Sequence, residues 1–381
     1  MIRIKSDKII TRDGLFDGFV YLDGERIVDL SDKATDADLC YDFTGDYLSP
    51  GFIDIHTHGG GGYAFADSTA DEVLSGCEFH LGFGTTTIVP TVSASEFDAM
   101  KASLESIRRA KNDPRRRVNI LGAHLEGPYL SPEQCGGQCL SSITPPIREQ
   151  YESLALEYAD SLCRWSYAPE NDKGGEFCDF LRKRGIVASA GHTNAKYSDM
   201  CLAIDKGCNL VTHLYSCTST VTRDHGFRSL GVIETAFLRD ELYVEIIADG
   251  KHLPPELIKM IIKIKGKEKV ALITDSLSVA GSSQTSGNSC GTDFIVEDGV
   301  AKLPDRSAFA GSVATADVLV RTLIRDCGFD ICDSVYMLSA VPAKIMGVNK
   351  GEISAGKDAD LIVFDPEVRV SDAFVGGKKV I

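Results

Sequence analysis

Eight apolar, β-rich runs recur along the middle of the chain, and segments with helical periodicity separate them. The runs lie at residues 51–58, 86–92, 118–126, 164–169, 185–192, 210–215, 242–249 and 269–275. Amphipathic helices are predicted at residues 71–81, 94–110, 195–206 and 254–264. Near-continuous apolar strands that alternate with helices are typical of parallel strands covered on their outer face. Eight such units in roughly 250 residues favour an α/β fold of the (β/α)8 TIM-barrel type.

An open doubly wound sheet is the alternative arrangement for such a pattern. It would require a glycine-rich nucleotide-binding loop after the first strand. The sequence His56-Thr57-His58-Gly59 stands at that place instead. The barrel is therefore favoured.

Both ends of the chain differ from this pattern, because they consist of short strands and turns. Examples are residues 18–22 near the start and residues 359–365 near the end. We expect the two ends to pair into one small β-sandwich domain, residues 1–49 with 347–381. A barrel domain over residues 50–346 would interrupt it.

Composition narrows the function classes. With 381 residues, 43% of them apolar, the chain can bury a large core. Its net charge of −15 argues against nucleic acid or a membrane surface as the main partner. We find no signal segment and no apolar run of roughly 18 residues that could span a membrane. The twelve cysteines lack a paired zinc spacing, so we expect free thiols and a cytoplasmic protein.

Histidine and carboxylate residues fall where predicted strands end. In a strand, residues i and i+2 point to the same face, so His56 and His58 project their rings together, and glycines follow at positions 59–62. The six residues of this kind are His56, His58, Glu126, His192, His213 and Asp275. The carboxyl ends of all barrel strands open on one face, so these side chains are expected to converge. Each of these residues taken alone could have an ordinary structural role. It is improbable that structural roles explain all six at equivalent strand ends.

Four histidines with two carboxylates are suited to a divalent ion such as zinc, iron or manganese. The number of ligands allows one ion or two, with Glu126 bridging a pair. A bound ion would lower the pKa of its water toward about 7. Asp275 is the best candidate for the general base and acid that moves the protons.

The chain resembles the amidohydrolase superfamily and, within it, the N-acetylglucosamine-6-phosphate deacetylase family, nearly from end to end. The segments that carry this resemblance are residues 50–59, His124-Leu125-Glu126-Gly127-Pro128, Gly191-His192-Thr193, Thr212-His213-Leu214-Tyr215, residues 248–252, Thr274-Asp275, Ala310-Gly311-Ser312 and residues 356–361. The resemblance implies a metal-dependent hydrolase that removes the acetyl group from an N-acetyl amino-sugar 6-phosphate. It assigns the principal ion to Glu126, His192 and His213, and a second ion to His56 and His58.

The same resemblance implies a set of substrate-binding residues and a homodimer. His252 and Arg223 match positions that bind the sugar phosphate, and the family's histidine at the place of His252 reaches in from the neighbouring subunit. The other positions implied for substrate binding are Gly137, Gln138, Ser216, Cys217, Phe309 and Ala310. Gln138 stands where single-metal members carry a histidine and two-metal members can carry glutamine.

The chain departs from the family pattern in the segment Ser216-Cys217-Thr218, where the family has Asn-Ala-Met. This change leaves the identity of the sugar open, with a different N-acetylhexosamine phosphate, such as galactosamine, as one alternative. Another amide hydrolysis of the superfamily is a second alternative. A non-catalytic scaffold is a third, and the six retained ligand-type residues argue against it.

Overall fold

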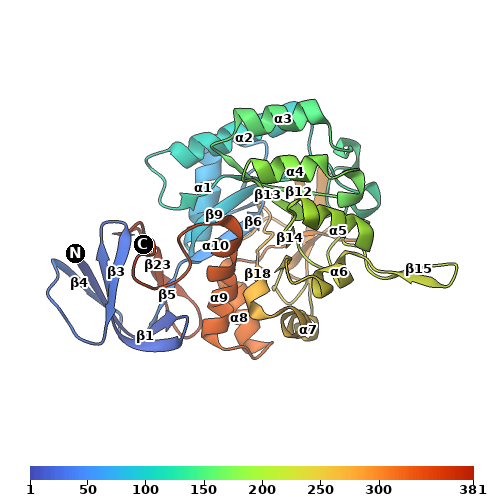
Figure 1. Ribbon diagram of the computed structural model, residues 1–381. Helices are drawn as coiled ribbons and strands as arrows, with labels where there is room; N and C mark the ends of the chain where they lie inside the picture. Colours follow the sequence, from blue (N-terminus) through green and yellow to red (C-terminus); the bar gives the residue numbers. More distant parts are fainter.

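A barrel of parallel strands occupies the centre of the molecule (Figure 1). This computed structural model describes residues 1–381, with the exception of the side chain of Asp224. The barrel strands are β6 (Phe52–Thr57), β9 (Thr85–Ser93), β11 (Ala123–Glu126), β12 (Leu162–Tyr167), β13 (Val187–Ala190), β14 (Leu210–Val211), β17 (Tyr243–Ile246) and β18 (Val270–Leu272), and β10 (Asn119–Ile120) also pairs with β9. Backbone bonds from Asp275 N to His56 O (2.9 Å) and from His58 N to Ser276 O (2.8 Å) bring the first and last strands together. The predicted barrel is confirmed.

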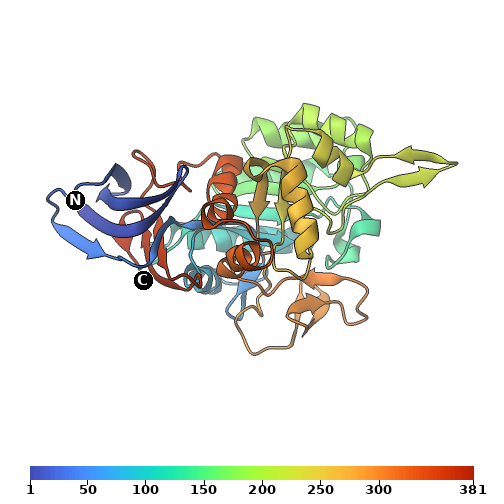
Figure 2. The same ribbon diagram turned by 90° about the horizontal axis from the view of Figure 1, so that it is seen from below.

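Helices surround the barrel (Figures 1 and 2). Four of them match predicted segments: α1 (Ala70–Leu81), α2 (Phe97–Asn112), α5 (Tyr197–Lys206) and α7 (Pro255–Lys265). The others are α3 (Arg148–Glu157), α4 (Glu176–Lys183), α6 (Val232–Leu238), α8 (Ala316–Arg325), α9 (Ile331–Leu338) and α10 (Ala340–Met346). Helix α8 buries Ala316, Leu319, Val320 and Leu323, which recur at the spacing of one helical face. Helix α1 begins at a capping box between Thr69 and Glu72.

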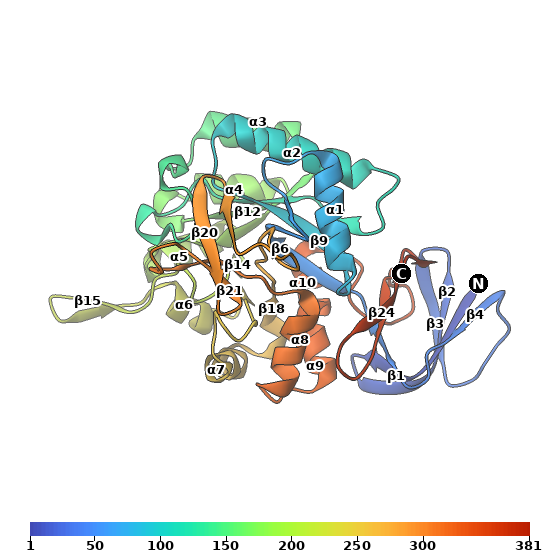
Figure 3. The ribbon, with the colours of Figure 1, turned by 180° about the vertical axis from the view of Figure 1, so that it is seen from behind.

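A second sheet collects strands from both ends of the chain, and both termini lie in it (Figures 1 and 3). Its strands are β1 (Ile2–Thr11), β2 (Gly14–Asp23), β3 (Arg26–Ser31), β4 (Leu39–Asp42), β5 (Tyr47–Pro50), β23 (Leu361–Phe364), β24 (Val370–Val375) and β25 (Lys378–Lys379). It has a core of its own, which includes Ile4, Val20, Leu48 and Phe374. Strand β5 pairs with β23 as far as Pro50, so we propose that this terminal domain runs through residue 50.

Gly51 alone separates the terminal sheet from the first barrel strand. A Cβ atom at this position would lie 2.0 Å from Oγ1 of Thr86, because the backbone passes directly against β9. Only glycine allows so close an approach.

Three groups of strands were not predicted. The hairpin of β15 (Thr222–Asp224) and β16 (Phe227–Ser229) projects away from the barrel (Figure 1). An antiparallel sheet of β19 (Ser286–Ser289), β20 (Thr292–Glu297), β21 (Val300–Lys302) and β22 (Phe309–Gly311) lies against the barrel in Figure 3, and a short hairpin joins β7 (Gly59–Gly60) to β8 (Tyr63–Ala64). None of the helices in the described chain combines the length and the apolar character needed to cross a membrane.

Candidate metal centre

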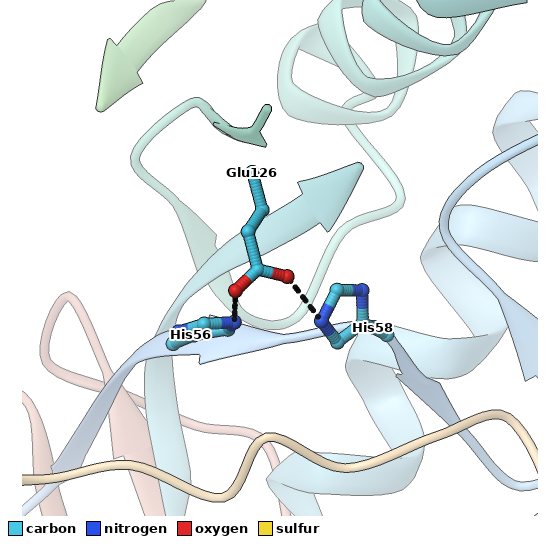
Figure 4. Close-up of side chains that lie close together, drawn as sticks. All are labelled: His56, His58 and Glu126. Atoms are coloured by element: carbon cyan, nitrogen blue, oxygen red, sulfur yellow. Dashed lines mark ion pairs between the residues drawn. The ribbon is translucent and has the colours of Figure 1, made fainter. Parts of the chain in front are cut away.

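Glu126, the last residue of β11, lies at the centre of a histidine cluster. Its Oε1 lies 2.9 Å from His213 Nε2, 3.2 Å from His192 Nε2 and 3.4 Å from His56 Nε2. Its Oε2 lies 3.2 Å from His58 Nε2. Figure 4 shows the carboxylate between the rings of His56 and His58, with one oxygen facing each ring. The strands β6 and β11, together with the segments after β13 and β14, therefore bring five of the six predicted residues to one point.

Asp275 completes the cluster from the segment that follows β18. Its Oδ1 lies 3.2 Å from His58 Nε2 and 3.5 Å from His56 Nε2. Its backbone is fixed on both sides, because Asp275 N donates to His56 O and Ser312 N donates to Asp275 O. All six residues that the sequence indicated thus meet at the mouth of the barrel.

Four of these residues lie beyond the ends of their strands, contrary to expectation. His58 is the first of them, because β6 ends at Thr57. Strands β13, β14 and β18 end at Ala190, Val211 and Leu272, before His192, His213 and Asp275 are reached. The φ angles of these three residues are +47°, +27° and +48°, a region that non-glycine residues rarely adopt. The chain leaves the ladder there and turns each side chain toward the barrel axis. Such strained positions are typical of functional sites.

The outer hydrogen bonds of the histidines define which ring nitrogen faces the cluster. His192 Nδ1 donates to Gln134 O at 2.8 Å, and His213 Nδ1 donates to Ser216 O at 3.1 Å. A carbonyl only accepts, so both rings carry a proton on Nδ1. When neutral, each therefore presents the lone pair of Nε2 inward. The two Nε2 atoms lie 3.2 Å apart.

This donor set fits a metal ion. Two groups have ligand atoms within 4.8 Å of one another: His56, His58 and Glu126, and Glu126, His192 and His213. Both ring nitrogens of His56 are buried and have no hydrogen-bond partner among the described residues. A buried polar atom without a hydrogen-bond partner lowers the stability of the fold, and a metal ion bound to Nε2 of His56 would give that nitrogen a partner. Imidazole and carboxylate donors are suited to zinc, iron or manganese.

The electrostatics of the cluster favour a bound cation. Burial lowers the pKa of His56, but the charges of Glu126 and Asp275 outweigh it and raise that pKa to about 10. Burial raises the pKa of Glu126, yet His56 and His192 hold it well below its ordinary value. The same balance, with His56 and His58 as the opposing charges, lowers the pKa of Asp275. Two buried carboxylates thus remain ionised and require positive charge beside them, from protons or from a metal ion.

A pocket opens directly on this cluster. Its walls include His58, Glu126, His192, His213 and Asp275 together with seven of the eight residues expected to bind substrate: Gly137, Gln138, Ser216, Cys217, His252, Phe309 and Ala310. Arg223 is the exception, because it lies exposed on the projecting β15–β16 hairpin. His252 lines the pocket of its own chain, whereas we expected it to complete a neighbour's site.

Two of the pocket residues are held by neighbours. Gln138 Nε2 donates to Glu126 Oε2 at 2.7 Å, while Gln138 Oε1 accepts from Ala94 N at 2.8 Å. Its amide is therefore engaged with a metal-ligand candidate rather than free for a substrate. Asp249 Oδ2 lies 2.8 Å from His252 Nδ1 and accepts its proton, and Phe309 packs edge-on against the ring of His252.

Other pocket residues were not predicted from the sequence. Ser93, at the end of β9, places its Oγ 3.1 Å from His58 Nδ1. Leu277, Ser289 and Ala308 line the same pocket, and the last two belong to the unpredicted β19–β22 sheet or to its connections. Small polar and apolar residues of this kind carry no recognisable sequence signal. For Ser93 the only available signal was its place at the end of a predicted strand.

Known proteins resemble this chain over most of its length. The model of the amidohydrolase family matches residues 47–380. An N-acetylglucosamine-6-phosphate deacetylase of Haemophilus influenzae is 30% identical, over 88% of this chain and 87% of the relative. An N-acetylgalactosamine-6-phosphate deacetylase of a Shewanella species is also 30% identical, over 89% of this chain and 84% of the relative.

A solved structure shares the whole architecture. It is an N-acetyl-D-glucosamine-6-phosphate deacetylase mutant of Mycobacterium smegmatis in complex with N-acetyl-D-glucosamine-6-phosphate. It is 27% identical, with a TM-score of 0.91 over 100% of this chain and 99% of that one. By the family match and the relatives together, this chain belongs to the amidohydrolase family.

Proposed function

We propose that the chain is a metal-dependent hydrolase that removes the acetyl group from an N-acetyl amino-sugar 6-phosphate, with N-acetylglucosamine 6-phosphate as the preferred substrate. The observation that carries this proposal is the Glu126 cluster with four histidines, which opens on a pocket beside Asp275. The relatives named for deacetylation of such sugar phosphates support the choice of substrate class.

The ligands of the principal ion would be Glu126, His192 and His213, and those of a second ion His56 and His58 with Glu126 shared. Zinc, iron and manganese suit these donors. When bound, such an ion supplies Lewis acidity that polarises the amide carbonyl and lowers the pKa of water toward about 7.

Asp275 would move the proton. Its pKa is lowered despite burial, so at neutral pH it is ionised and can accept a proton at Oδ1 from the attacking water. The protonated carboxyl then donates to the departing nitrogen. Acetate and the free amino sugar phosphate are the products.

His252 would hold the phosphate group of the substrate. Asp249 accepts the Nδ1 proton and fixes the ring, so the other nitrogen remains for a ligand in the pocket. Phe309 limits the rotation of the same ring. A sugar without phosphate would lose this contact, so we expect phosphorylated substrates to be preferred.

We further propose a homodimer in which Arg223 contributes to the partner's pocket. Arg223 matches a phosphate-binding position but stands on a hairpin that extends away from its own pocket (Figure 1). Phe227 on the same hairpin is 80% exposed, and a partner subunit that receives Arg223 would cover it. A cytoplasmic location is part of the proposal, because all twelve cysteines are free thiols.

A panel of sugars tests this function. Metal-loaded protein would be incubated with N-acetylglucosamine, N-acetylgalactosamine and N-acetylmannosamine, each with and without a 6-phosphate, and acetate would be measured. We expect release from the glucosamine 6-phosphate derivative foremost and a large loss without phosphate. The His252→Ala variant should raise KM for the phosphorylated sugar and leave the unphosphorylated one unaffected. No acetate from any member of the panel would refute the proposal.

N-acetylgalactosamine 6-phosphate is the second candidate substrate. Ser216 and Cys217 line the pocket at the place where the sequence departs from the family pattern, and one relative is named for the galactosamine derivative. A higher kcat/KM for that sugar in the same panel would favour this alternative.

A further inference from the structure

Among the four histidines of the cluster, His56 differs in the group that its Nδ1 atom faces. Nδ1 of His192 and of His213 donates to a backbone carbonyl, and Nδ1 of His58 lies beside a serine hydroxyl. Nδ1 of His56 instead lies 3.5 Å from Oε2 of Glu245, a residue of β17. The ring can bind an ion through Nε2 only when its proton is on Nδ1, and Glu245 is the carboxylate that faces this nitrogen.

Glu245 is held in turn by an arginine from another strand of the barrel. Arg164 on β12 donates Nη2 to Glu245 Oε2 at 2.8 Å and Nη1 to Glu245 Oε1. Arg164 also donates Nη1 to the carbonyl of Ile55, the residue before His56, at 2.8 Å. Ser189 Oγ accepts from Nε of the guanidinium, and Thr212 Oγ1 accepts from Nη2. The arginine thus fixes both the carboxylate behind His56 and the backbone that carries His56.

Stability alone does not explain this ion pair. Both side chains are completely buried in the barrel. Removing two charges from water costs several kcal/mol per ion, and well-packed apolar residues often replace such a pair with no loss of stability. Barrel interiors are ordinarily filled by branched aliphatic side chains. A charged pair placed directly behind one ligand candidate points to a role in orienting that ligand.

We infer that Glu245, held by Arg164, is a positioning residue that sets the tautomer and orientation of His56 and thereby controls occupancy of the second metal position, an inference that rests on the proposed metal site. The principal position does not depend on it, because His192 and His213 are oriented by Gln134 and Ser216. Loss of such an outer-shell partner typically lowers metal affinity by about 10–100-fold.

Zinc binding to three forms of the full chain tests this inference. Zinc per chain would be counted by elemental analysis, and each affinity measured by competition with a chromophoric chelator. In Glu245→Gln we expect the weaker zinc to bind about 10–100-fold less tightly and the tighter one to be unchanged. The matched control is Asp360→Asn, which weakens the ion pair between Lys350 and the buried Asp360 next to the terminal sheet and should leave both affinities unchanged.

A double variant, Arg164→Met with Glu245→Leu, removes both charges of the buried pair and so leaves neither of them unpaired. It tests the dependence of the weaker zinc on Glu245 if the single variant Glu245→Gln does not fold. It too should lose the weaker zinc. Two zinc ions bound as tightly as in the wild type by either variant would overturn the inference. A wild type that binds a single zinc would also overturn it while the proposed function stands. A wild type that binds no zinc, iron or manganese would refute the proposed function itself.

Discussion

At the scale of single residues, Glu126 organises the site because it touches every histidine of the cluster. One oxygen faces His56, His192 and His213, and the other faces His58 and accepts from Gln138. A shorter aspartate could not reach rings from three different chain segments. The sequence indicated this residue as a ligand, but the role of Gln138 in fixing its second oxygen is visible only in three dimensions.

Replacement of Asp275 by asparagine should remove proton transfer while preserving the shape of the site. General acid–base catalysis contributes about 10²–10⁴-fold, so we expect a loss of that order in kcat, measured as acetate release. The zinc content should be determined in parallel, because Asp275 also lies near His56 and His58. Asp365→Asn in the terminal domain is the control. A fully active Asp275→Asn enzyme with normal zinc content would exclude the proposed proton transfer.

At the scale of elements, the apolar runs predicted the barrel strands and four helices well, but not where the strands end. The run at residues 210–215 is a strand only over β14, since His213 and Tyr215 have positive φ angles. The sequence cannot reveal this, because the apolar pattern continues through residues whose backbone has left the ladder. Positions of the ligands relative to the strands were therefore predicted only to within two or three residues.

The β19–β22 sheet was missed for a related reason. Its strands are short and mostly half-exposed, so they carry little apolar periodicity, and Ser286, Gly287, Asn288 and Ser289 of β19 are poor strand formers. Tertiary contacts with the barrel mouth stabilise them instead. This sheet supplies Ser289 and Phe309 to the pocket. Phe309 was inferred from the family resemblance, and Ser289 was not inferred at all.

The contact between α1 and the β7 segment predicts how stability depends on pH. His80 is buried on α1 beside Gly59 O, at 2.9 Å from Nε2, and burial lowers its pKa to about 4. Between pH 4 and 6.5 the unfolded chain binds a proton there that the folded chain does not. Stability from this residue is therefore complete above pH 6.5 and is lost by about 1.4 kcal/mol per pH unit below it.

Urea unfolding at pH 7 and pH 5 measures this loss, which should be about 2 kcal/mol for His80. In His80→Gln, whose amide can still donate to Gly59 O, the difference between the two pH values should shrink by that amount. An unchanged difference in the variant would assign the acid sensitivity to other groups.

At the scale of the whole molecule, the two ends of the chain are expected to stabilise each other. Strand β23 lies between β5 and β24, so a chain that stops before residue 361 leaves β5 as an edge strand that pairs with β1 alone. It also loses Leu361, Phe364 and Phe374, each worth about 1.5–3 kcal/mol when buried. That sum is comparable with the stability of a typical protein, about 5–15 kcal/mol.

We therefore expect the chain without residues 361–381 to be unfolded or aggregated, as judged by circular dichroism and gel filtration. The variant Lys378→Ala, which changes an exposed residue of the edge strand β25, should unfold at the wild-type temperature. A truncated chain that unfolds cooperatively at the wild-type temperature would show that the barrel does not depend on the terminal sheet.

The family and the general chemistry were predictable from the sequence because the ligand types and their spacing are local signals. The placement of Arg223 outside its own pocket was not, since no sequence pattern shows how far a hairpin projects. The Arg164–Glu245 pair was missed because two charges about 80 residues apart carry no mark of being buried together. Sequence thus indicated what binds, and the three-dimensional arrangement shows what holds the ligands in place.

The most direct test of the account compares acetate release from N-acetylglucosamine 6-phosphate by metal-loaded, chelator-stripped and Glu126→Gln protein. The loaded wild type should release acetate and free amine in equal amounts, stripping should abolish release, and zinc or manganese should restore it. Glu126→Gln should bind metal weakly and stay inactive after the same reloading. Equal rates in the stripped or Glu126→Gln protein, or no acetate from a wild type that holds its metal, would contradict the central claim.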